Sequence, residues 1–305
     1  MKNPLVSFIV NCYNGEEFLE RALKSIISQT YSNWELIFWD NCSTDNSKKI
    51  FESFDNDKFK YFYSKSNVSL GQARAWAVEK CNGEYIAFLD VDDEWYPEKT
   101  KIQIEIMIND SSVLSYSDIK EIDENKKSFI TKTLWHTGYI FSNQLRQFEI
   151  NLPSAMINRS VLLKKNLNFD PKIQASEEYC LFMQLIYKER VSVIKKVLAK
   201  YYIRRNSLTN QKSHLWSSER KHTLNLIIKN NPLSIKYYRN DFSEAFARAE
   251  YYKVRHIVFE KKYFEAKAVM KNIAFKDFKY FVLFIILSIS INLWNYVHEF
   301  KSKRG

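Results

Sequence analysis

The first hundred residues alternate between short apolar runs and segments with helical spacing. The apolar runs are five to seven residues long and are Val6–Cys12, Trp34–Trp39, Lys60–Ser64 and Tyr85–Leu89. Helical patterns fall between them, over Glu16–Gln29, from Asp45 onward and over Leu70–Cys81. Strands of this length separated by helices form βαβ units. The pattern therefore predicts an α/β fold, with a mostly parallel central sheet and flanking helices.

Polar residues follow each of the four apolar runs, at Asn14, Asp40, Asn67 and Asp90–Asp93. The carboxyl ends of parallel strands meet at one edge of a sheet, where ligands of such folds bind. We therefore expect a binding site at this edge. The alternative for each residue is a loop or helix-capping role, which Asp and Asn also favour. For Asp45, which precedes a helical pattern, we expect a cap.

The strongest local signal is Asp90-Val91-Asp92-Asp93, directly after the fourth apolar run. Two carboxylates in such a turn suit Mg²⁺ or Mn²⁺, which take oxygen ligands and retain waters and substrate phosphates. The metal would stabilise the negative charge on a departing diphosphate. Acidic turns also occur without a metal. The chain has no Gly-rich phosphate loop with a P-loop lysine, which argues against NTP hydrolysis.

An ordered set of motifs between about residues 5 and 212 resembles glycosyltransferase family 2. The motifs are Val6–Asn14, Leu23–Ile26, Gln29–Tyr31, Trp34–Ile37, Asp40–Asp45, Gly71–Arg74 and Leu89–Lys99. The resemblance implies the GT-A (nucleotide-diphospho-sugar transferase) fold, with a catalytic domain over 1–215. Residues 1–110 of that domain would bind the nucleotide sugar, and 111–215 would form the acceptor and base region.

The same resemblance implies a metal-dependent (Mn²⁺ or Mg²⁺) inverting glycosyltransferase of the hexosyl or N-acetylhexosaminyl class. It would move a sugar from a UDP-sugar to an acceptor hydroxyl in cell-surface glycan assembly. The acceptor would be a lipid-linked oligosaccharide, a lipopolysaccharide or a capsular glycan.

The resemblance also assigns donor-binding roles. The nucleotide pocket would be lined by Cys12, Tyr13 and Asn14, with Glu17 nearby. Asp40 would hydrogen-bond the uracil edge of UDP. Asp90 would lie near the ribose or the metal, and Asp92 would ligate the metal directly. Arg74 would either support these carboxylates as an ion pair or approach the diphosphate.

The catalytic base is expected further along the chain, because inversion needs a carboxylate opposite the leaving group. The segment Ser176–Leu185 resembles the family's base motif and places Glu178 where the family usually has aspartate. A helix N-terminus favours the ionised carboxylate that a base needs. The alternative is that Glu177 and Glu178 only complement the helix dipole after a Ser176 cap.

A second departure lies in Tyr201–Thr209, which resembles the family's Tyr-Arg-x-His-x-x-Ser-x-Ser run. Here Tyr202 replaces the arginine and Arg204 replaces the histidine. A guanidinium binds phosphate in a bidentate manner, so Arg204 would contact the diphosphate. The alternative is an exposed basic loop residue.

Residues 216–305 are expected to form a basic, aromatic-rich helical C-terminal region. They hold 17 of the lysines and arginines but only 8 of the acidic residues, while the preceding residues are nearly neutral. Within them, 281–293 is almost wholly apolar and has basic flanks that include Lys303 and Arg304. A full membrane span needs about 20 apolar residues. The run therefore favours an interfacial or re-entrant helix, and the alternative is a buried helix.

We accordingly expect the protein at the cytoplasmic face of the inner membrane, held peripherally or by its C-terminal helix. Its expected partners are the UDP-sugar, a lipid-linked or glycan acceptor and the membrane surface, but not nucleic acid. Candidates for stacking on acceptor sugars are Trp95, Trp135 and His136. The four cysteines fall at no metal-ligand spacing and suggest a reducing compartment.

Three rival functions remain at this point. A sugar-1-phosphate nucleotidyltransferase should have a Gly-rich basic loop after the first strand, which 11–16 lacks. An RNA-binding protein would explain the charge but not the polar residues at the strand ends. A catalytically silent nucleotide-sugar-binding or membrane-scaffold relative is favoured only by Glu178 in place of aspartate.

Overall fold

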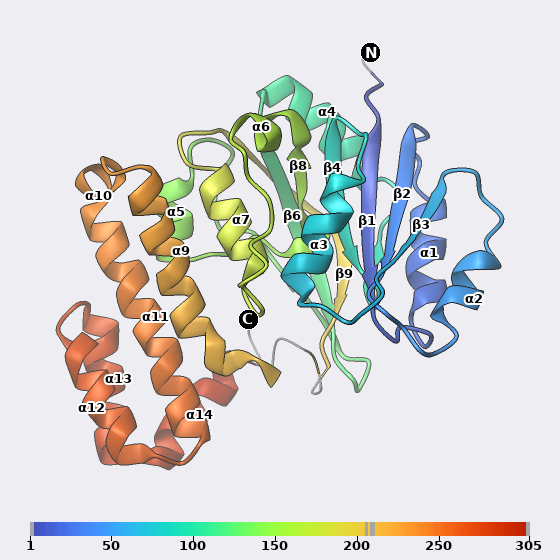
Figure 1. The fold of residues 1–305 in the computed structure, drawn as a ribbon. Coiled ribbons are helices and arrows are strands. Elements are labelled where there is room, and N and C mark those ends of the chain that lie inside the picture. The colour runs from blue at the N-terminus through green and yellow to red at the C-terminus, as the bar shows by residue number, and fades with distance from the viewer. Residues whose placement is uncertain (1–2, 205–206, 208–210, 303–305) are drawn as a thin grey trace. The chain divides into compact units, whose positions relative to one another are not determined.

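The computed structural model describes residues 3–204, 207 and 211–302. The chain divides into two compact units (Figure 1). Unit 1 comprises Met1–Phe141 and Phe148–Arg205, and unit 2 comprises Ser142–Gln147 and Asn206–Gly305. Of the residues considered above, Arg205, Asn206, Leu208, Thr209, Lys303 and Arg304 lie outside the described residues.

Unit 1 is built on one sheet, with strand order β3-β2-β1-β4-β8-β6-β9-β5 and with β7 paired to β6. Its strands are β1 (Val6–Cys12), β2 (Trp34–Asp40), β3 (Phe59–Tyr63), β4 (Tyr85–Asp90), β5 (Glu94–Trp95), β6 (Leu114–Ile122), β7 (Ser128–Thr131), β8 (Met156–Asn158) and β9 (Val191–Tyr202). The pairs β1–β2, β1–β4, β2–β3 and β6–β9 are parallel. The short strands β5, β7 and β8 pair antiparallel. The sheet is therefore mixed, and the parallel half predicted from the first hundred residues is confirmed.

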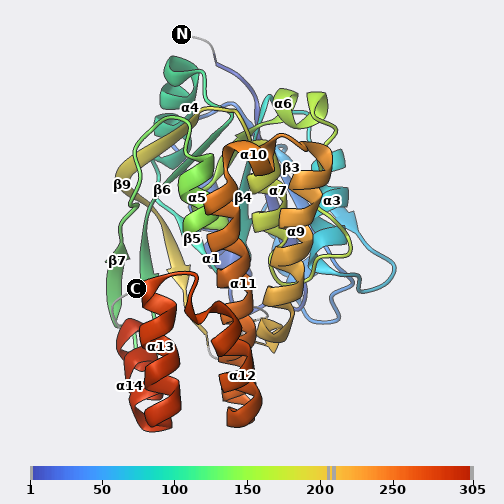
Figure 2. The same cartoon turned by 90° about the vertical axis from the view of Figure 1, so that its left-hand side faces the viewer.

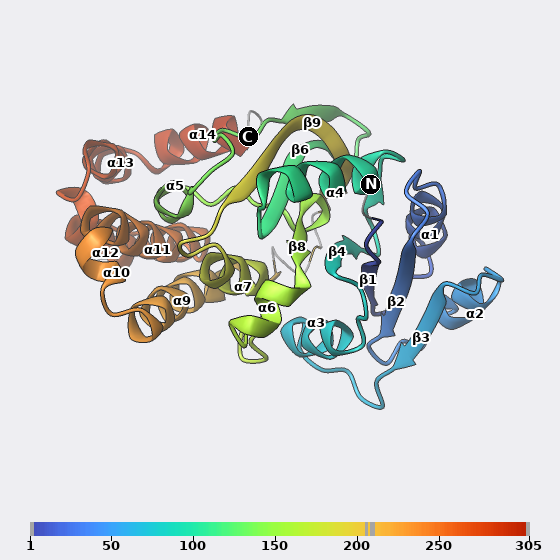
Figure 3. The same ribbon diagram turned by 90° about the horizontal axis from the view of Figure 1, so that it is seen from above.

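Helices cover both faces of this sheet. They are α1 (Leu19–Ile27), α2 (Ser47–Glu52), α3 (Leu70–Glu79), α4 (Lys99–Asp110), α6 (Arg159–Lys164) and α7 (Glu177–Leu185). Figure 3 shows α1, α2 and α4 on one face and α3, α6 and α7 on the other. Successive side chains of β1 point to opposite faces of the sheet. Phe8 and Val10 therefore share one face and pack in one core cluster with Leu23 of α1 and Met107 of α4.

The chain after β1 makes a turn before it enters α1. The backbone amides of Phe18 and Leu19 both donate to the carbonyl of Gly15, at 2.9 and 3.0 Å. The helix expected from Glu16 therefore begins only at Leu19. The N-cap residue of α2 is Asn46, not Asp45, and its side chain makes no capping bond. The carboxylate of Asp45, one residue earlier, still accepts the amide of Ser47 at the start of α2 (3.0 Å).

Unit 2 is helical, as the spacing of its sequence predicts. Its helices are α9 (Trp216–Asn230), α10 (Ser234–Tyr237), α11 (Arg239–Phe259), α12 (Tyr263–Ala274), α13 (Phe278–Ile289) and α14 (Ile291–Ser302). Most of α5 (Phe141–Arg146) also belongs to it, and Arg146 pairs with Asp241 of α11 at 2.5 Å. Figure 2 shows α12, α13 and α14 side by side. Their inward side chains, among them Met270, Leu283 and Trp294, form one buried cluster with α11.

The single helix expected over the apolar run 281–293 is wrong, because the run is broken between α13 and α14. Ser290 has an extended backbone (φ −152°, ψ 122°), and its hydroxyl accepts the amide of Leu293 at 3.2 Å. Serine favours such a capping position because its side chain replaces a missing backbone acceptor. Among the described residues, no helix combines the length and the apolar character needed to cross a bilayer.

Candidate active site

The carboxyl ends of β1 to β4 meet at one edge of the sheet, drawn at the bottom of unit 1 in Figure 1. There the loops after β1 and β2 bind each other through Asn14. The backbone amide of Asn14 donates to the Ser43 hydroxyl (3.0 Å), and its side-chain oxygen accepts the backbone amide of Thr44 (2.8 Å). Asn14 holds a positive φ of 50°, a conformation that asparagine tolerates better than most residues. Asn14 thus fixes the loops after β1 and β2 to each other.

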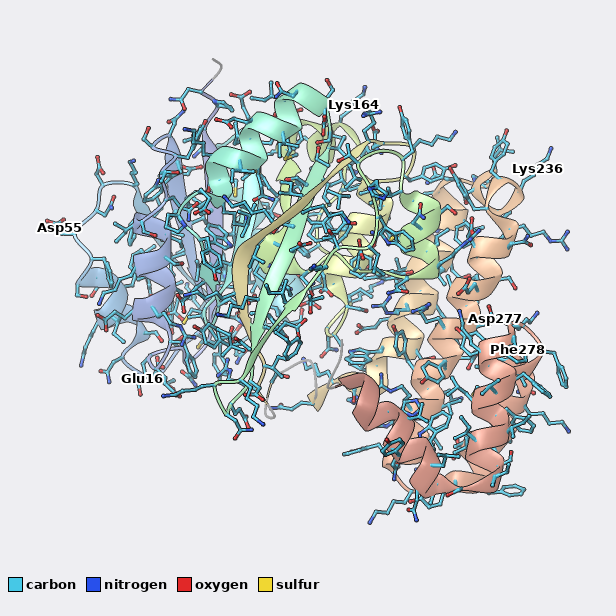
Figure 4. The ribbon with its side chains drawn as sticks, turned by 180° about the vertical axis from the view of Figure 1, so that it is seen from behind. Glu16, Asp55, Lys164, Lys236, Asp277 and Phe278 are labelled. Atoms are coloured by element: carbon cyan, nitrogen blue, oxygen red, sulfur yellow. The ribbon has the colours of Figure 1, made fainter. Side chains whose placement is uncertain are left out.

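Glu16 also holds the loops after β1 and β2 together, a role that was not predicted from the sequence. Its carboxylate accepts both the amide (2.9 Å) and the side-chain nitrogen (2.8 Å) of Asn46, while Asp45 accepts the amide of Glu16 at 2.9 Å. Figure 4 shows Glu16 at the same edge of unit 1. Exposed loop carboxylates are common, so nothing in the local sequence marked this one.

Asp40 ends β2 and is buried, with 1% of its surface exposed. One carboxylate oxygen accepts the amide of Ser43 (2.7 Å), and the other accepts the hydroxyl of Tyr61 (2.7 Å). Burial and this hydrogen bond to Asp40 raise the pKa of Tyr61, so the phenol stays a donor. Cys12 lies alongside on β1, where burial raises the pKa of its thiol. Tyr13, by contrast, is 52% exposed.

The acidic turn after β4 packs directly against the loop after β1. A Cβ atom added at Gly15 would lie 2.7 Å from a methyl carbon of Val91 and 2.9 Å from the sulfur of Cys12. Only glycine allows this approach without displacing its neighbours. The loop after β1 and the Asp90–Asp93 turn are therefore held in contact.

Arg74 joins the acidic turn to α7. The side chain is 4% exposed and donates to Asp90 and to Glu177, at 2.7 Å in each case. Burial by itself would lower the pKa of Arg74, but the charges of Asp90 and Glu177 raise it. Of the two roles considered for Arg74, the structure places it as an ion pair that supports the carboxylate cluster.

The position of Arg74 follows from tight packing of α3 on the loop before α7. A Cβ at Gly71 would lie 2.7 Å from the carbonyl oxygen of Asp170 and 2.8 Å from that of Ile173. The Ser69 hydroxyl caps α3 and also donates to the carbonyl of Pro171 (2.9 Å). These contacts hold α3, and with it Arg74, against the segment that leads into α7.

The two glutamates at the start of α7 differ in environment. Glu177 is 3% exposed and bound to Arg74, whereas Glu178 is half-buried. Glu178 still lies close enough for its charge to raise the pKa of Arg74. Ser176 occupies the N-cap position, although its side chain makes no capping hydrogen bond. Glu177 is therefore a structural partner of Arg74, and Glu178 is the more accessible carboxylate.

Asp92 is paired with Arg204, the arginine that follows β9. Arg204 also lies over the ring of Phe18, with 4.1 Å between the guanidinium carbon and the ring centroid. Arg21 of α1 donates to the backbone oxygen of Asp92 at 2.6 Å and stacks on Tyr202 at 3.8 Å. Arg21 was missed from the sequence, because one basic residue on an amphipathic helix carries no local signal.

Asp93 is the most buried member of the turn, at 1% exposed. One of its oxygens accepts the amide of Tyr202 at 2.9 Å, and the other has no partner among the described residues. Burial and the charges of Asp92 and Asp90 raise the pKa of Asp93 well above its ordinary value. Burial and Asp90 also raise the pKa of Asp92, against the opposing charge of Arg204. Burial and mutual repulsion thus disfavour the ionised forms of Asp92 and Asp93.

Comparison with known proteins identifies the family of this chain. Residues 7–165 match the family model described as glycosyl transferase family 2. The chain belongs to this family. It is 26% identical over 221 residues to the putative teichuronic acid biosynthesis glycosyltransferase TuaG of Bacillus subtilis, covering 72% of this chain and 85% of that protein. It is 27% identical over 214 residues to WfgD of Escherichia coli, covering 70% and 82%. WfgD is named a UDP-Glc:alpha-D-GlcNAc-diphosphoundecaprenol beta-1,3-glucosyltransferase.

Solved structures show the same fold for this glycosyltransferase. The structure of S. aureus TarS 1–349 in complex with UDP-GlcNAc aligns with a TM-score of 0.61 at 18% identity, over 98% of this chain and 91% of that one. The mannosyltransferase PcManGT of Pyrobaculum calidifontis, in complex with GDP-Man and Mn²⁺, aligns at 0.60 with 14% identity, over 85% and 76%. The fold is therefore GT-A-like.

The residues of this glycosyltransferase fit a divalent cation held jointly with its substrate. Asp90 and Asp92 offer hard oxygen ligands, with side chains 32% and 20% exposed, and Asp93 has a buried oxygen without a partner among the described residues. The part of the chain that is described contains no cluster of three ligating side chains around one point. Mg²⁺ and Mn²⁺ bind through one or two carboxylates when substrate phosphates and waters complete the shell.

Glu17 and Trp95 lie in different environments. Glu17 is exposed and lines a hollow of about 670 Å³ between α1 and β5, together with Arg21 and Lys200. Trp95 is wrong as a sugar-stacking candidate, because it is 3% exposed. Its indole nitrogen donates to the carbonyl of Pro153 at 2.8 Å, so it belongs to the core. Trp135 is half-buried and His136 is exposed.

Proposed function

We propose that the protein transfers a hexosyl or N-acetylhexosaminyl residue from a UDP-sugar to an acceptor hydroxyl, with inversion at the anomeric carbon. The edge where the carboxyl ends of β1 to β4 meet is called here the donor edge. The observation that carries this proposal is the Arg74 bridge, which ties Asp90 at the donor edge to the helix start that bears Glu178. It brings a metal-suited acidic turn and a candidate base into one cluster. The TarS complexes with UDP and UDP-GlcNAc support a uridine donor.

Glu178 would act as the general base. It would take the proton of the acceptor hydroxyl while that oxygen attacks the anomeric carbon, and the bond from that carbon to the diphosphate breaks as UDP leaves. A carboxylate in the first turn of a helix is stabilised as the anion by the helix dipole. Arg74 would keep Asp90 and α7 in fixed relation during the reaction. Mn²⁺ or Mg²⁺, bound by Asp92 and Asp90, would supply Lewis-acid stabilisation of the diphosphate.

The proposed acceptor is a lipid-linked or glycan hydroxyl in the assembly of a cell-surface polysaccharide such as capsule or lipopolysaccharide. WfgD is named for a diphosphoundecaprenol acceptor and TuaG for teichuronic acid biosynthesis. An acceptor of this kind is held in a membrane, so a soluble domain needs a surface that docks to it. We place the reaction at the cytoplasmic face of the inner membrane.

Helices α12 and α13 offer such a surface within unit 2. They expose an apolar face, called here the hairpin face, formed by Phe264, Phe275, Phe278, Ile285 and Ile289. The members are spaced by helical turns along each helix, while Tyr280, Leu283 and Leu287 of α13 point into the core. The helices touch at both ends, through the rings of Phe275 and Phe281 (5.9 Å) and through Lys267, which donates to the carbonyl of Ser288 (3.2 Å).

Charge favours an anionic phospholipid surface as the occupant of the hairpin face. Between residues 261 and 289 the chain has six lysines and only two acidic residues. Figure 4 labels Phe278 and Asp277 at the turn that joins the two helices. Apolar helices flanked by lysines lie in the interface of an anionic bilayer, where both apolar area and charge contribute. The hairpin face would therefore hold the enzyme peripherally.

The test of the proposed function is a donor screen with a stereochemical readout. Purified protein with Mn²⁺ is titrated calorimetrically with UDP, GDP and their sugars, and the bound donor is then assayed with diphosphoundecaprenol-linked acceptors. We expect binding of a UDP-sugar and a product of inverted anomeric configuration by NMR. A retained configuration would refute inversion. Tight donor binding without turnover on any acceptor would favour the catalytically silent relative.

A further inference from the structure

Arg204 and a divalent cation compete for the same carboxylate. The guanidinium of Arg204 is bound to Oδ2 of Asp92, and Asp92 is the residue that the family assignment gives to the metal. Asp90, the second candidate ligand, is held by Arg74. The two candidate ligands, Asp90 and Asp92, are thus each already paired with an arginine of this chain.

The two arginines differ in how firmly they are held. Arg74 is 4% exposed and braced by two carboxylates, so losing one of them would strand a buried charge. Arg204 has a side chain that is 36% exposed. Its guanidinium lies over the ring of Phe18, the N-cap residue of α1, and an aromatic face can keep a cation in place while its anionic partner changes. Arg204 is therefore the member that can exchange its partner.

We propose that Arg204 is a partner-exchange residue, which neutralises Asp92 before the donor binds and moves to the diphosphate when Asp92 takes a cation. This inference rests on the proposed donor. Arg204 must leave Oδ2 before Asp92 can ligate a cation through that oxygen. The released guanidinium, still over Phe18, is then beside the place where diphosphate charge arrives. Guanidinium forms strong bidentate bonds to phosphate oxygens.

The exchange predicts the direction in which the affinity for Mn²⁺ changes when Arg204 is replaced, even in the absence of nucleotide. In Arg204→Gln the cation no longer displaces a guanidinium, so the affinity of the protein for Mn²⁺ alone should rise by about two- to fivefold, the equivalent of one exposed ion pair. In the same variant the affinity for UDP in the presence of saturating Mn²⁺ should fall by about tenfold, because the diphosphate loses its arginine. A residue with a merely structural role would not move the two constants in opposite directions.

The experiment measures free Mn²⁺ by electron paramagnetic resonance and UDP by calorimetry, on wild type, Arg204→Gln, Arg204→Lys and Lys196→Gln. Lys196 pairs with Glu98 at 3.0 Å outside the turn, so Lys196→Gln removes the same charge without touching Asp92 and should leave both constants unchanged. Arg204→Lys keeps the charge and should lie between wild type and Arg204→Gln.

Unchanged or weaker Mn²⁺ binding by Arg204→Gln overturns the exchange. So does an equal gain in Lys196→Gln, which would mean a general effect of net charge. If no variant binds UDP, the proposed function fails, whereas the Mn²⁺ measurement without nucleotide still decides whether Arg204 and the cation compete. Loss of fold in Arg204→Gln is checked by thermal unfolding, and Arg204→Lys then carries the comparison, with a smaller gain for Mn²⁺ supporting the exchange and no gain refuting it.

Discussion

The donor edge of unit 1 and the hairpin face of unit 2 use opposite kinds of surface. At the donor edge, Asp40, Arg74 and Asp92 each have a named partner at hydrogen-bonding distance. On the hairpin face, Phe264 and Phe278 are 90% and 79% exposed and apolar. Directed polar contacts recognise one ligand geometry, whereas exposed apolar area recognises a class of surface. Single substitutions should therefore act sharply on the first region and by increments on the second.

The largest effect is expected from Asp92→Asn. The amide keeps the size of the side chain but removes the charge that a cation and Arg204 both need, so we expect no measurable transfer and much weaker Mn²⁺-dependent UDP binding. Vesicle binding by unit 2 should not change. The control is Asp55→Asn, at an exposed acid away from the donor edge (Figure 4). Normal transfer by Asp92→Asn, or by wild type in excess chelator, would remove the metal site.

The next effect separates the two glutamates of α7. Glu178→Gln should lower turnover by ~10²–10⁴, the usual contribution of positioned proton abstraction, with UDP affinity unchanged. Glu177→Gln should act on stability instead, because it removes one partner of the buried Arg74; the free energy of unfolding should fall by about 3 kcal/mol. Turnover per folded molecule and chemical denaturation check both. A larger turnover loss at Glu177 would move the base by one residue.

The sequence predicted the parallel strands and the polar residues at their carboxyl ends because these signals are local. Each strand of the βαβ segment is a short apolar run, and each candidate site residue lies at its end or within a few positions of it, as Asp40 ends β2 and Asp90 ends β4. The roles of Glu16, Arg21 and the Glu177–Arg74 pair could not be predicted. They depend on contacts between residues 30 to 103 positions apart, for which a single sequence holds no pattern.

In unit 2 the sequence predicted helices but not how they divide. The apolar run 281–293 contains no glycine or proline, so the break at Ser290 depends on a serine cap that could equally have remained inside a helix. The hairpin face was hidden for a second reason. Which apolar residues stay exposed depends on how α12 and α13 pack on α11, and amphipathic spacing marks only which residues share a side.

Binding to vesicles should weaken stepwise as exposed apolar residues of the hairpin face are replaced. Phe278→Glu and Ile289→Glu alter residues that are 79% and 75% exposed at opposite ends of α13, so folding should be spared. Each loses up to ~1.5–3 kcal/mol of apolar burial on docking, and binding to phosphatidylglycerol vesicles should fall about tenfold per substitution. Transfer to a soluble acceptor should be unchanged. Cosedimentation measures the binding.

Leu233→Glu is the matched control for the hairpin face, since Leu233 is 58% exposed and precedes α10. Equal losses in the control would point to a general charge effect. A variant that combines Phe278→Glu and Ile289→Glu tests the alternative. If its vesicle binding is unchanged but its sedimentation mass differs from that of the wild type, the hairpin face is a contact between copies of this chain instead.

The smallest effect tests whether every buried charge of unit 1 serves the donor edge. Lys99 of α4 is fully buried; it donates to Gln103 at 2.6 Å and lies 4.3 Å from the Trp95 ring. Burial lowers the pKa of Lys99 well below its ordinary value of 10.5. Between the lowered pKa and 10.5 the unfolded chain binds more protons than the folded chain, so the stability of the wild type rises with pH across that window.

Lys99→Met should remove this slope and raise the free energy of unfolding by roughly 1–3 kcal/mol at pH 7, with transfer and vesicle binding unchanged. The advantage of the variant should shrink as the pH approaches 10, and Lys101→Met, at an exposed lysine of the same helix, should show neither effect. If Lys99→Met instead lowers transfer at unchanged stability, Lys99 supports the donor edge from the core of unit 1. The polar contacts that distinguish unit 1 from the hairpin face of unit 2 would then extend beyond the donor edge.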